Sequence, residues 1–341
     1  MKKIKAAIMA DNIPFHDGDI IEYVYGKELP SLIDSMTDLY PVRITSKNLD
    51  EELPGLADTE VIFSSWGIPP LTSWQLDKMP RLKVVFYAGG SSKAFAPKLL
   101  ERGITVCSAV QANAIPVAEF CLAQILLSCK NAYQNSRLCR NGPWNYTEMA
   151  TGPGVYGETI ALIGIGAISR HLLKLLKPFS LRIIAVSGYL SDNPDAARAL
   201  GIDQIVSMEE AFRRAHVVSN HLPDREDNKG VMMKEHFASM RPRATFINTG
   251  RGAQVDESGM IEVLKMRPDL TALLDVQHPE PPAPGSELYS LPNVHLTSHI
   301  AGSINNEVRR MGDFMFEDFL RYMDDKPLKY AVESENIAAM A

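Results

Sequence analysis

The chain has 341 residues, of which 45% are hydrophobic and 22% are charged, and its formal net charge at pH 7 is −6. These fractions are those of ordinary globular proteins and exclude a disordered or fibrous chain. At roughly 100–200 residues per domain, the length predicts two domains. The negative net charge argues against nucleic acid or an anionic membrane as a partner, because both favour a basic face.

The N-terminal segment predicts a cytoplasmic protein rather than an exported one. Its apolar run Ala6–Ala10 ends at Asp11, and this is shorter than the roughly 7–15 residues of a signal-peptide core. No run approaches the roughly 18 apolar residues of a membrane-spanning helix, so no membrane association is expected. The four cysteines lack metal-ligand spacing, which predicts reduced thiols and no metal site.

The first third of the chain alternates short apolar runs with amphipathic stretches, which predicts a parallel sheet covered by helices on both faces. The predicted helices include Leu29–Leu39 and Ala94–Arg102. The predicted strands are Ile4–Met9, Val42–Ile44, Val61–Phe63, Leu82–Tyr87 and Ile104–Cys107.

A nearly continuous apolar helix is predicted over Val117–Cys129, because Pro116 directly ahead of it is a helix start signal. The helix is too hydrophobic for an exposed face, so we expect a core element or part of a dimer interface. The following segment, Asn141–Tyr156, is rich in Gly and Pro and is predicted to be a loop.

A second alternating series follows and has six predicted strands, the number in a full Rossmann domain. Helices are predicted between the strands, for example over Ile168–Leu176 and Glu257–Leu264, and a last helix over Ile304–Tyr322. The strands are Thr159–Ile163, Arg182–Val186, His216–Asn220, Thr245–Asn248, Thr271–Val276 and Val294–Thr297.

The two series predict an α/β protein with two Rossmann-like, doubly wound parallel-sheet domains. Residues 113–301 are predicted to form a Rossmann domain of the nucleotide-binding type. The last helix needs a surface on which to pack, and we expect it to return to the first domain. The nucleotide-binding domain is then an insertion into a flavodoxin-like substrate domain made of residues 1–112 plus 302–341.

A glycine-rich loop, Gly164–Ser169, directly follows the strand Thr159–Ile163 and precedes a predicted helix. Gly164 allows a tight turn, and Gly166 lacks the side chain that would block a pyrophosphate. The amides of the helix N-terminus would then bind that anion. The third glycine of the GxGxxG pattern is replaced by Ser169, which is still small enough for close helix–strand packing.

The strand Arg182–Val186 ends without the acidic residue that usually binds the ribose hydroxyls of NAD. Ser187 stands there, and Asp192 comes only later in the loop. A serine would not repel a 2′-phosphate, yet no arginine adjacent in the sequence is ready to pair with one. The sequence therefore favours NAD slightly and leaves NADP open.

Three later segments place polar residues at the ends of predicted strands, where open α/β sheets bind ligands. Arg251 lies between two glycines and can grip a carboxylate with two parallel hydrogen bonds. Glu280 is a carboxylate in a proline-rich segment, and His299 closes the last strand. Each residue, taken alone, is more often structural than catalytic.

Together these motifs resemble the D-isomer-specific 2-hydroxyacid dehydrogenases, a family that includes lactate, glycerate and phosphoglycerate dehydrogenases. The resemblance covers nearly the whole chain, and several independent motifs occur in the same order. They are Leu82–Ser91, Gly103–Val106, Val117–Glu119, Gly164–Ser169, His221–Pro223, Asn248–Gly252, Asp275–Pro281 and Leu296–Gly302.

The resemblance implies a catalytic set of Arg251, Glu280 and His299. Arg251 would bind the substrate carboxylate and polarise its carbonyl group. His299 would be the general acid/base, and the anionic Glu280 beside it would favour its protonated form for reduction. Asp275 would hold the nicotinamide carboxamide.

The resemblance also implies the remaining binding residues of a D-2-hydroxyacid dehydrogenase that takes a small 2-keto or 2-hydroxy acid. Members of the family are commonly homodimers. Substrate would be bound by Gly89, Gly90, Ser91, Arg251 and His299. NAD(P) would be bound by Gly164, Gly166, Ala167, Ile168, Ser187, Leu222, Pro223, Thr249, Gly250, Arg251, Asp275, His299 and Gly302.

Two positions depart from the family pattern. Ser91 replaces a second glycine of the substrate turn, and Ser298 replaces a proline ahead of the histidine. The sequence therefore does not identify the substrate. The walls of its pocket are expected around Trp66–Pro70, Gly89–Lys93 and Asn141–Tyr146.

Two other functions share this fold. An NAD(H)-sensing corepressor could retain the same three residues, but the chain has no basic segment or long disordered extension. A formate dehydrogenase would need a glutamine where Glu280 stands.

Overall fold

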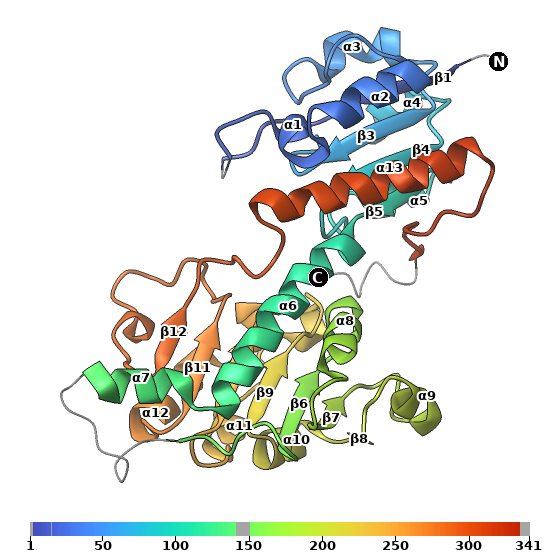
Figure 1. The fold of residues 1–341 in the computed structure, drawn as a ribbon. Helices are drawn as coiled ribbons and strands as arrows, with labels where there is room; N and C mark the ends of the chain where they lie inside the picture. The colour runs from blue at the N-terminus through green and yellow to red at the C-terminus, as the bar shows by residue number, and fades with distance from the viewer. Residues whose placement is uncertain (1–2, 15, 141–150, 335–341) are drawn as a thin grey trace. The chain divides into compact units, whose positions relative to one another are not determined.

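A computed structural model describes residues 3–14, 16–140 and 151–334 of the chain. The chain folds into two compact units (Figure 1). Unit 1 runs from the N-terminus to Asn113 and resumes at Ser303, and unit 2 is the intervening segment Ala114–Gly302. Each unit is built on a parallel sheet covered by helices, which confirms the predicted fold class.

The sheet of unit 1 has the strand order β2-β1-β3-β4-β5, and all neighbouring strands are parallel. This is the order of flavodoxin-like folds, whose ligands bind at the carboxyl ends of the strands. Strands β3 and β4 are buried over their whole length, as expected for central strands of a parallel sheet. The strands are β1 (Ile4–Ile8), β2 (Thr37–Leu39), β3 (Val61–Ser65), β4 (Val84–Ala88) and β5 (Thr105–Ser108).

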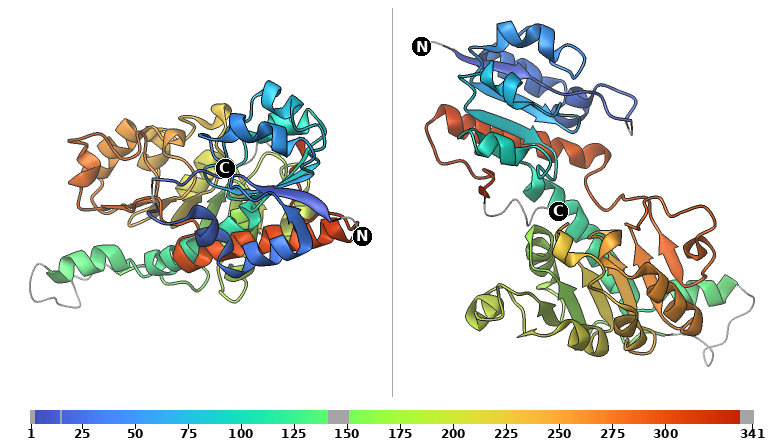
Figure 2. Two further views of the ribbon diagram at one scale, coloured as in Figure 1. Left: turned by 90° about the horizontal axis from the view of Figure 1, so that it is seen from above. Right: turned by 180° about the vertical axis from the view of Figure 1, so that it is seen from behind.

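Helices cover both faces of this sheet, because successive residues of a strand point to opposite faces. In β1, Ala6 belongs to the core formed with α1, α2 and α13, whereas Ala7 belongs to the core formed with α3, α4 and α5. Figure 2 shows the helices of each unit from two further sides. The helices of unit 1 are α1 (Ile20–Tyr25), α2 (Glu28–Met36), α3 (Leu49–Leu56), α4 (Ser73–Asp77), α5 (Ala96–Leu100), η4 (Asn305–Val308) and α13 (Arg309–Met323).

The sheet of unit 2 has the strand order β12-β11-β10-β9-β6-β7-β8, again with all neighbours parallel. The order reverses between β6 and β9, so the carboxyl ends of these two strands form the switch point at which Rossmann folds bind dinucleotides. The strands are β6 (Thr159–Ile163), β7 (Arg182–Val186), β8 (Gln204–Ile205), β9 (Val217–Asn220), β10 (Thr245–Asn248), β11 (Thr271–Leu274) and β12 (Val294–Leu296).

Two apolar cores again occupy the two faces of the sheet in unit 2. One contains residues of α10, α11 and α12, and the other contains residues of α6, α8 and α9. The helices are α6 (Val110–Cys129), which begins at the end of unit 1, α7 (Ala132–Arg140), α8 (Ala167–Leu176), α9 (Pro194–Ala199), α10 (Met208–Arg214), η1 (Glu226–Asn228), α11 (Lys234–Ala238), η2 (Gly252–Gln254), α12 (Glu257–Met266) and η3 (Glu287–Tyr289).

Helix α6 begins seven residues earlier than predicted, at Val110 instead of Val117, so Pro116 lies inside it. Pro116 has no backbone N–H to donate to the carbonyl four residues earlier, so α6 continues through it without that hydrogen bond. By length and apolar composition α6 could span a membrane, a test that buried core helices also pass. Cys121, Ile125 and Cys129 of this helix are fully buried in the core of unit 2.

Two other predicted elements were wrong. Residues Thr37–Leu39 form a strand instead of the end of a helix, because the Thr37 hydroxyl donates to the Ile33 carbonyl and ends α2. The predicted strand Val42–Ile44 is reduced to a single bridge between Ile44 and Met9. Strand β8 is only two residues long, which is too short to show a periodic pattern.

Candidate active site

The turn after β6 can be made only by glycine at position 164. Gly164 has a φ of +85°, and a Cβ added there would lie 2.8 Å from the His221 carbonyl oxygen. Both the left-handed backbone and the close approach therefore exclude a side chain. The turn is closed by Ser169, whose hydroxyl donates to the Gly164 carbonyl at 2.6 Å. Ser169 thus takes over the close packing that the third glycine of the pattern normally provides.

The space above Gly166 is open, since a Cβ added there would meet no atom within 4 Å. Gly166 caps α8, and Ala167 and Ile168 form its first turn. The first amides of a helix have no partner within the helix and, with its dipole, favour an anion. Open space in front of these amides fits the pyrophosphate of a dinucleotide.

A buried amide network holds the backbone around Arg251. Asn220 and Asn248 end the paired strands β9 and β10 in register, and the Asn220 amide donates to the side-chain oxygens of Asn248 and Gln254 at 2.9 and 2.7 Å. The Gln254 oxygen also accepts from the Arg251 backbone N–H at 3.1 Å. This network was not predicted, although two asparagines at paired strand ends are the signal from which it could have been found.

The same network fixes the strand-end segments that were predicted to contact the cofactor. The Gln254 amide donates to the carbonyls of Leu222 and Pro223 at 3.1 and 2.8 Å. The backbone N–H of Gly250 donates to the Asn248 side chain at 3.1 Å. The loops after β9 and β10 are therefore joined by hydrogen bonds from the buried Gln254 side chain.

The loop after β10 also packs directly on the loop after β11. A Cβ on Gly252 would lie 2.0 Å from the Gln277 carbonyl carbon, so a side chain there would separate the two loops. Within this frame the Arg251 side chain is 30% exposed. Its Nη1 donates to the Gly250 carbonyl at 2.8 Å, and its Nε lies 3.7 Å from an Asp224 carboxylate oxygen.

His299 and Glu280 form a direct pair. The Nδ1 atom of His299 lies 2.7 Å from Oε1 of Glu280, and the two side chains are 48% and 38% exposed. His299 has a φ of +58°, a left-handed conformation that is uncommon for residues other than glycine. Such a backbone persists only where its surroundings hold it, and it occurs often at active sites.

Asp275 supplies that support. Its buried carboxylate accepts hydrogen bonds from the backbone N–H groups of Ile300 and Ala301 at 2.9 and 3.0 Å, and from the Thr297 hydroxyl at 2.6 Å. The His299 N–H donates to the Asp275 backbone carbonyl at 3.0 Å. Asp275, at the end of β11, therefore shapes the turn that carries His299 and leads to Gly302.

His221 lies in a buried polar chain beneath these loops. Its two ring nitrogens lie 2.9 Å from the Ser219 hydroxyl and 3.2 Å from the Thr249 hydroxyl. The Thr249 hydroxyl is also 3.5 Å from the Cys121 sulfur. Burial lowers the pKa of His221 to about 3 and raises the pKa of the Cys121 thiol to about 12, so both are neutral at pH 7. The Thr249 hydroxyl is thus used within the protein, and its predicted contact with the cofactor stays a prediction.

The buried neutral His221 should make the fold sensitive to acid. The unfolded chain binds a proton at the ordinary pKa of 6.5, whereas folded His221 does so only near pH 3. Its contribution to stability is therefore complete above pH 6.5 and falls as the pH is lowered toward 3. Between pH 7 and pH 5, the difference in the free energy of unfolding between the wild type and His221→Gln should decrease by about 2 kcal/mol. Urea unfolding at both pH values measures this, with the exposed His278→Gln as control; an unchanged difference would contradict it.

The predicted substrate turn follows β4 in unit 1. The Gly90 carbonyl accepts from the Ser108 hydroxyl at 2.6 Å, and a Cβ on Gly89 would collide with the Tyr87 ring. The Ser91 hydroxyl accepts from the Lys93 backbone N–H at 3.4 Å. Gly89, Gly90 and Ser91 therefore form a braced turn at the carboxyl edge of the sheet.

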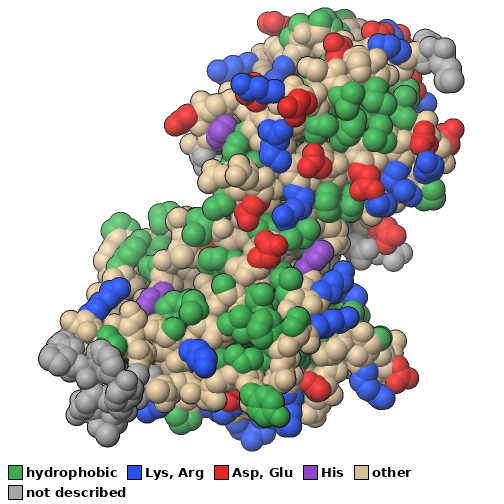
Figure 3. Space-filling view, viewed as in Figure 1, with side chains coloured by type: hydrophobic (Ala, Val, Ile, Leu, Met, Phe, Trp, Pro, Cys, Tyr) green, Lys and Arg blue, Asp and Glu red, His purple; other side chains and the backbone are tan. Residues whose placement is uncertain are grey.

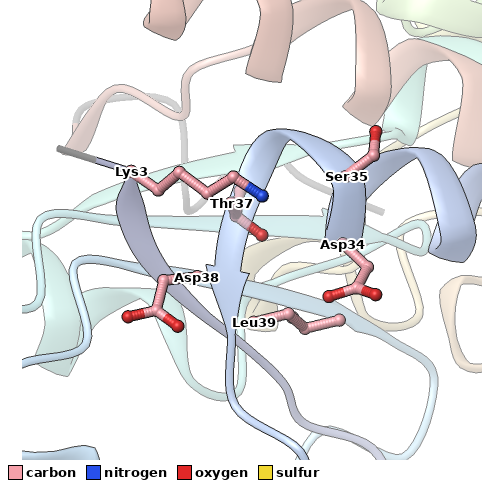
Figure 4. Close-up of a pocket in the computed structure, with 6 residues that line it drawn as sticks. All are labelled: Lys3, Asp34, Ser35, Thr37, Asp38 and Leu39. Carbon is pink, nitrogen blue, oxygen red and sulfur yellow. The ribbon is translucent and has the colours of Figure 1, made fainter. Parts of the chain in front are cut away.

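Unit 1 also has hollows among its described residues. A small apolar one lies beside this edge and is lined by Pro69, Pro70 and Phe95, among others. The second, shown in Figure 4, lies where Lys3 precedes β1 and Thr37 begins β2. That is the amino edge of the sheet, opposite to the edge at which such folds bind ligands. The predicted pocket wall Asn141–Tyr146 lies outside the described residues.

The fold and these loops define a two-unit α/β protein of the dinucleotide-binding class. The sequence model of the D-isomer-specific 2-hydroxyacid dehydrogenase NAD-binding domain matches residues 122–301, just over half of the chain. The chain belongs to the D-isomer-specific 2-hydroxyacid dehydrogenase family.

Named relatives fit this family. The chain is 28% identical over 294 residues to a D-3-phosphoglycerate dehydrogenase of Methanocaldococcus jannaschii, covering 86% of this chain and 55% of that protein. It is 27% identical to a glyoxylate reductase of Korarchaeum cryptofilum, covering 74% and 76%. The chain thus spans about half the length of the first curated relatives that it matches.

Solved structures establish the same fold. The D-mandelate dehydrogenase of Rhodotorula graminis superposes with a TM-score of 0.78 at 22% sequence identity, covering 97% of this chain and 98% of that one. A glyoxylate reductase from Paecilomyes thermophila gives a TM-score of 0.73 at 19% identity, covering 98% of this chain and 100% of that one.

Proposed function

We propose that the protein is an NAD(P)-dependent D-2-hydroxyacid dehydrogenase that acts on a small 2-keto or 2-hydroxy acid. The observation that carries this proposal is the His299–Glu280 pair at 2.7 Å, held in a left-handed turn by Asp275. The Arg251 loop and the glycine loop lie at carboxyl ends of strands in the same sheet. The bound nicotinamide would supply or accept the hydride.

His299 would move the proton that accompanies the hydride. Because Glu280 is an acceptor beside Nδ1, we assign the proton of the neutral ring to Nδ1. Nε2 is then the basic nitrogen that takes the substrate hydroxyl proton during oxidation and returns it during reduction. Glu280 fixes the ring orientation and stabilises the imidazolium that forms, as a carboxylate does in hydrolase triads.

Arg251 would bind and orient the substrate carboxylate. Its guanidinium has five N–H donors, and the contacts with Gly250 and Asp224 leave others for a bidentate pair with a carboxylate. The predicted contacts of Gly89, Gly90 and Ser91 of unit 1 with the substrate stay a prediction. The open space at Gly166, the α8 amides and the buried Ser187 hydroxyl suit the cofactor.

The direct test is a panel of 2-keto acids, from glyoxylate to aryl 2-keto acids, assayed separately with NADH and NADPH. At least one keto acid should be reduced, with loss of the reduced-nicotinamide absorbance and formation of the D-2-hydroxy acid or, from glyoxylate, of achiral glycolate. Chiral chromatography identifies the product. Absence of turnover across the panel with both cofactors would contradict the proposed activity.

The proposal extends to a cytoplasmic homodimer that takes a small molecule rather than nucleic acid. Leu127 of α6 and Leu138 of α7 are 46% and 41% exposed, and burial of these side chains against a second copy would remove apolar surface from water. All four cysteines are free, as in a reducing compartment. Acidic and basic side chains are intermixed on the face of each unit seen in Figure 3. Sedimentation equilibrium at twice 37.7 kDa would support the dimer.

A further inference from the structure

The loop that follows β7 lacks the group that selects NAD. In Rossmann folds an acidic side chain near this strand end binds the 2′-hydroxyl of the adenosine ribose and repels a 2′-phosphate. Here β7 ends at Val186 and is followed by Ser187, Gly188 and Tyr189. The strand end therefore carries no negative charge against a phosphorylated ribose.

Ser187 has a hydroxyl that the protein itself does not use. The residue is only 9% exposed, and its Oγ meets no hydrogen-bond partner among the described residues. A buried hydroxyl without a partner is unfavourable and needs an explanation, which a ligand bound at this loop would supply. To contact a ligand, this buried hydroxyl would rotate about χ1, a change that needs no movement of the backbone.

Arg170 and Tyr189 bring a positive charge to the same place. Arg170 lies in the first turn of α8, directly after the glycine loop, and its Nη2 donates to the Tyr189 hydroxyl at 2.9 Å. That hydroxyl in turn donates to the Ile165 carbonyl at 2.7 Å, which ties the loop after β7 to the glycine loop. Arg170 is exposed, and its guanidinium is held at the loop by one hydrogen bond to the Tyr189 hydroxyl, which leaves further N–H donors for a ligand.

The other charges around this loop do not replace Arg170. Arg198 lies on α9 and pairs with Asp195 at 3.3 Å. Asp192 is an exposed carboxylate five residues beyond Ser187. Among these groups, Arg170 is the cation that is attached both to the glycine loop and to the loop after β7.

We propose that Ser187 and Arg170 form a subsite for the 2′-phosphate of NADP(H), with Tyr189 as the residue that positions Arg170. The protein then prefers NADP(H) over NAD(H), contrary to the slight preference for NAD that the sequence favours. A phosphate would accept hydrogen bonds from the Ser187 hydroxyl and from the Arg170 guanidinium. This inference rests on the proposed function in that it assumes a dinucleotide at the Gly164–Ser169 loop.

The experiment is calorimetric titration of the full chain with 2′,5′-ADP and 5′-AMP, and in parallel with NADPH and NADH. The wild type should bind 2′,5′-ADP at least about tenfold more tightly than 5′-AMP. Arg170→Ala should weaken 2′,5′-ADP binding by about tenfold to a hundredfold, the range of a charge-assisted hydrogen bond, and leave 5′-AMP binding unchanged. Arg170→Lys should retain part of the preference for 2′,5′-ADP over 5′-AMP. Tyr189→Phe should weaken 2′,5′-ADP binding less than Arg170→Ala does.

Ser187→Asp should reverse the preference toward 5′-AMP and NADH, because a carboxylate would accept from the ribose hydroxyl and repel the phosphate. Ser187→Ala, which introduces no charge, tests the hydroxyl if the aspartate variant fails to fold. Arg198→Ala is the matched control, since it removes a neighbouring arginine that is paired elsewhere, and it should leave all four affinities unchanged.

Equal affinities for 2′,5′-ADP and 5′-AMP in the wild type would overturn the proposal. An Arg170→Ala variant with unchanged 2′,5′-ADP affinity would also overturn it. So would weaker 5′-AMP binding in Asp192→Ala, because that result would mean that the Asp192 carboxylate binds the ribose hydroxyls. The two fragments contain no nicotinamide, so their binding is independent of turnover. If no keto acid is reduced but 2′,5′-ADP is still preferred, only the proposed activity is rejected. If a keto acid is reduced but 2′,5′-ADP is not preferred, only the subsite is rejected.

Discussion

Replacing His299 with alanine is expected to lower kcat for keto acid reduction by about a hundredfold to ten-thousandfold, the range of general acid–base catalysis. The imidazole is the proton donor in the proposed reaction, and water would have to replace it. Cofactor affinity, measured by fluorescence titration, should change little, because the pyrophosphate is proposed to bind at the Gly166 turn and not at this loop. The combination of lost turnover and retained binding identifies a chemical role rather than a structural one.

The chain offers matched controls for this variant. His278 is an exposed histidine on the loop after β11, two residues from Glu280, and His278→Ala should leave kcat unchanged. Glu280→Gln keeps a polar side chain beside the Nδ1 atom of His299 but removes its charge, so it should lower kcat less than His299→Ala does. Turnover close to that of the wild type in His299→Ala would remove His299 from the proposed mechanism.

Much of the fold could be predicted because parallel strands buried on both faces are nearly continuous apolar runs. The strands Thr159–Ile163, Arg182–Val186 and Thr245–Asn248 have the predicted bounds. The errors fall where tertiary contacts override the local pattern. Thr37 ends α2 through its side chain, and Pro116 continues a helix that passes from one unit to the other.

The candidate site was predicted from motifs whose residues are adjacent in sequence, and these motifs do not contain its supporting contacts. Glu280 and His299 are 19 residues apart, and their contact follows from the ends of β11 and β12, which pair in register. The amide of Gln254 reaches Leu222, 32 residues away, and no local pattern indicates such a partner. Side-chain hydrogen bonds of this kind depend on three-dimensional placement and not on periodicity.

The second large effect is expected at Asp275, whose carboxylate accepts three hydrogen bonds from the turn that carries His299. Asp275→Asn places an amide N–H toward at least one backbone N–H, so one donor loses its acceptor. The turn should then relax, because the left-handed backbone of His299 has lost the contacts that hold it. The free energy of unfolding should fall by about 2–4 kcal/mol, and kcat should fall further than that of Glu280→Gln.

Asp203→Asn separates the positioning role from a general loss of stability. Asp203 is an exposed carboxylate that accepts the Ile183 backbone N–H at 2.6 Å, at the amino end of β7 and therefore at the opposite edge of the same sheet. Its replacement should lower stability in urea unfolding without lowering kcat. If both variants lose stability and neither loses activity at a temperature where both are folded, the role of Asp275 is only to stabilise the fold. Loss of turnover confined to Asp275→Asn would instead mean that this buried carboxylate sets the geometry of the proton-transfer group.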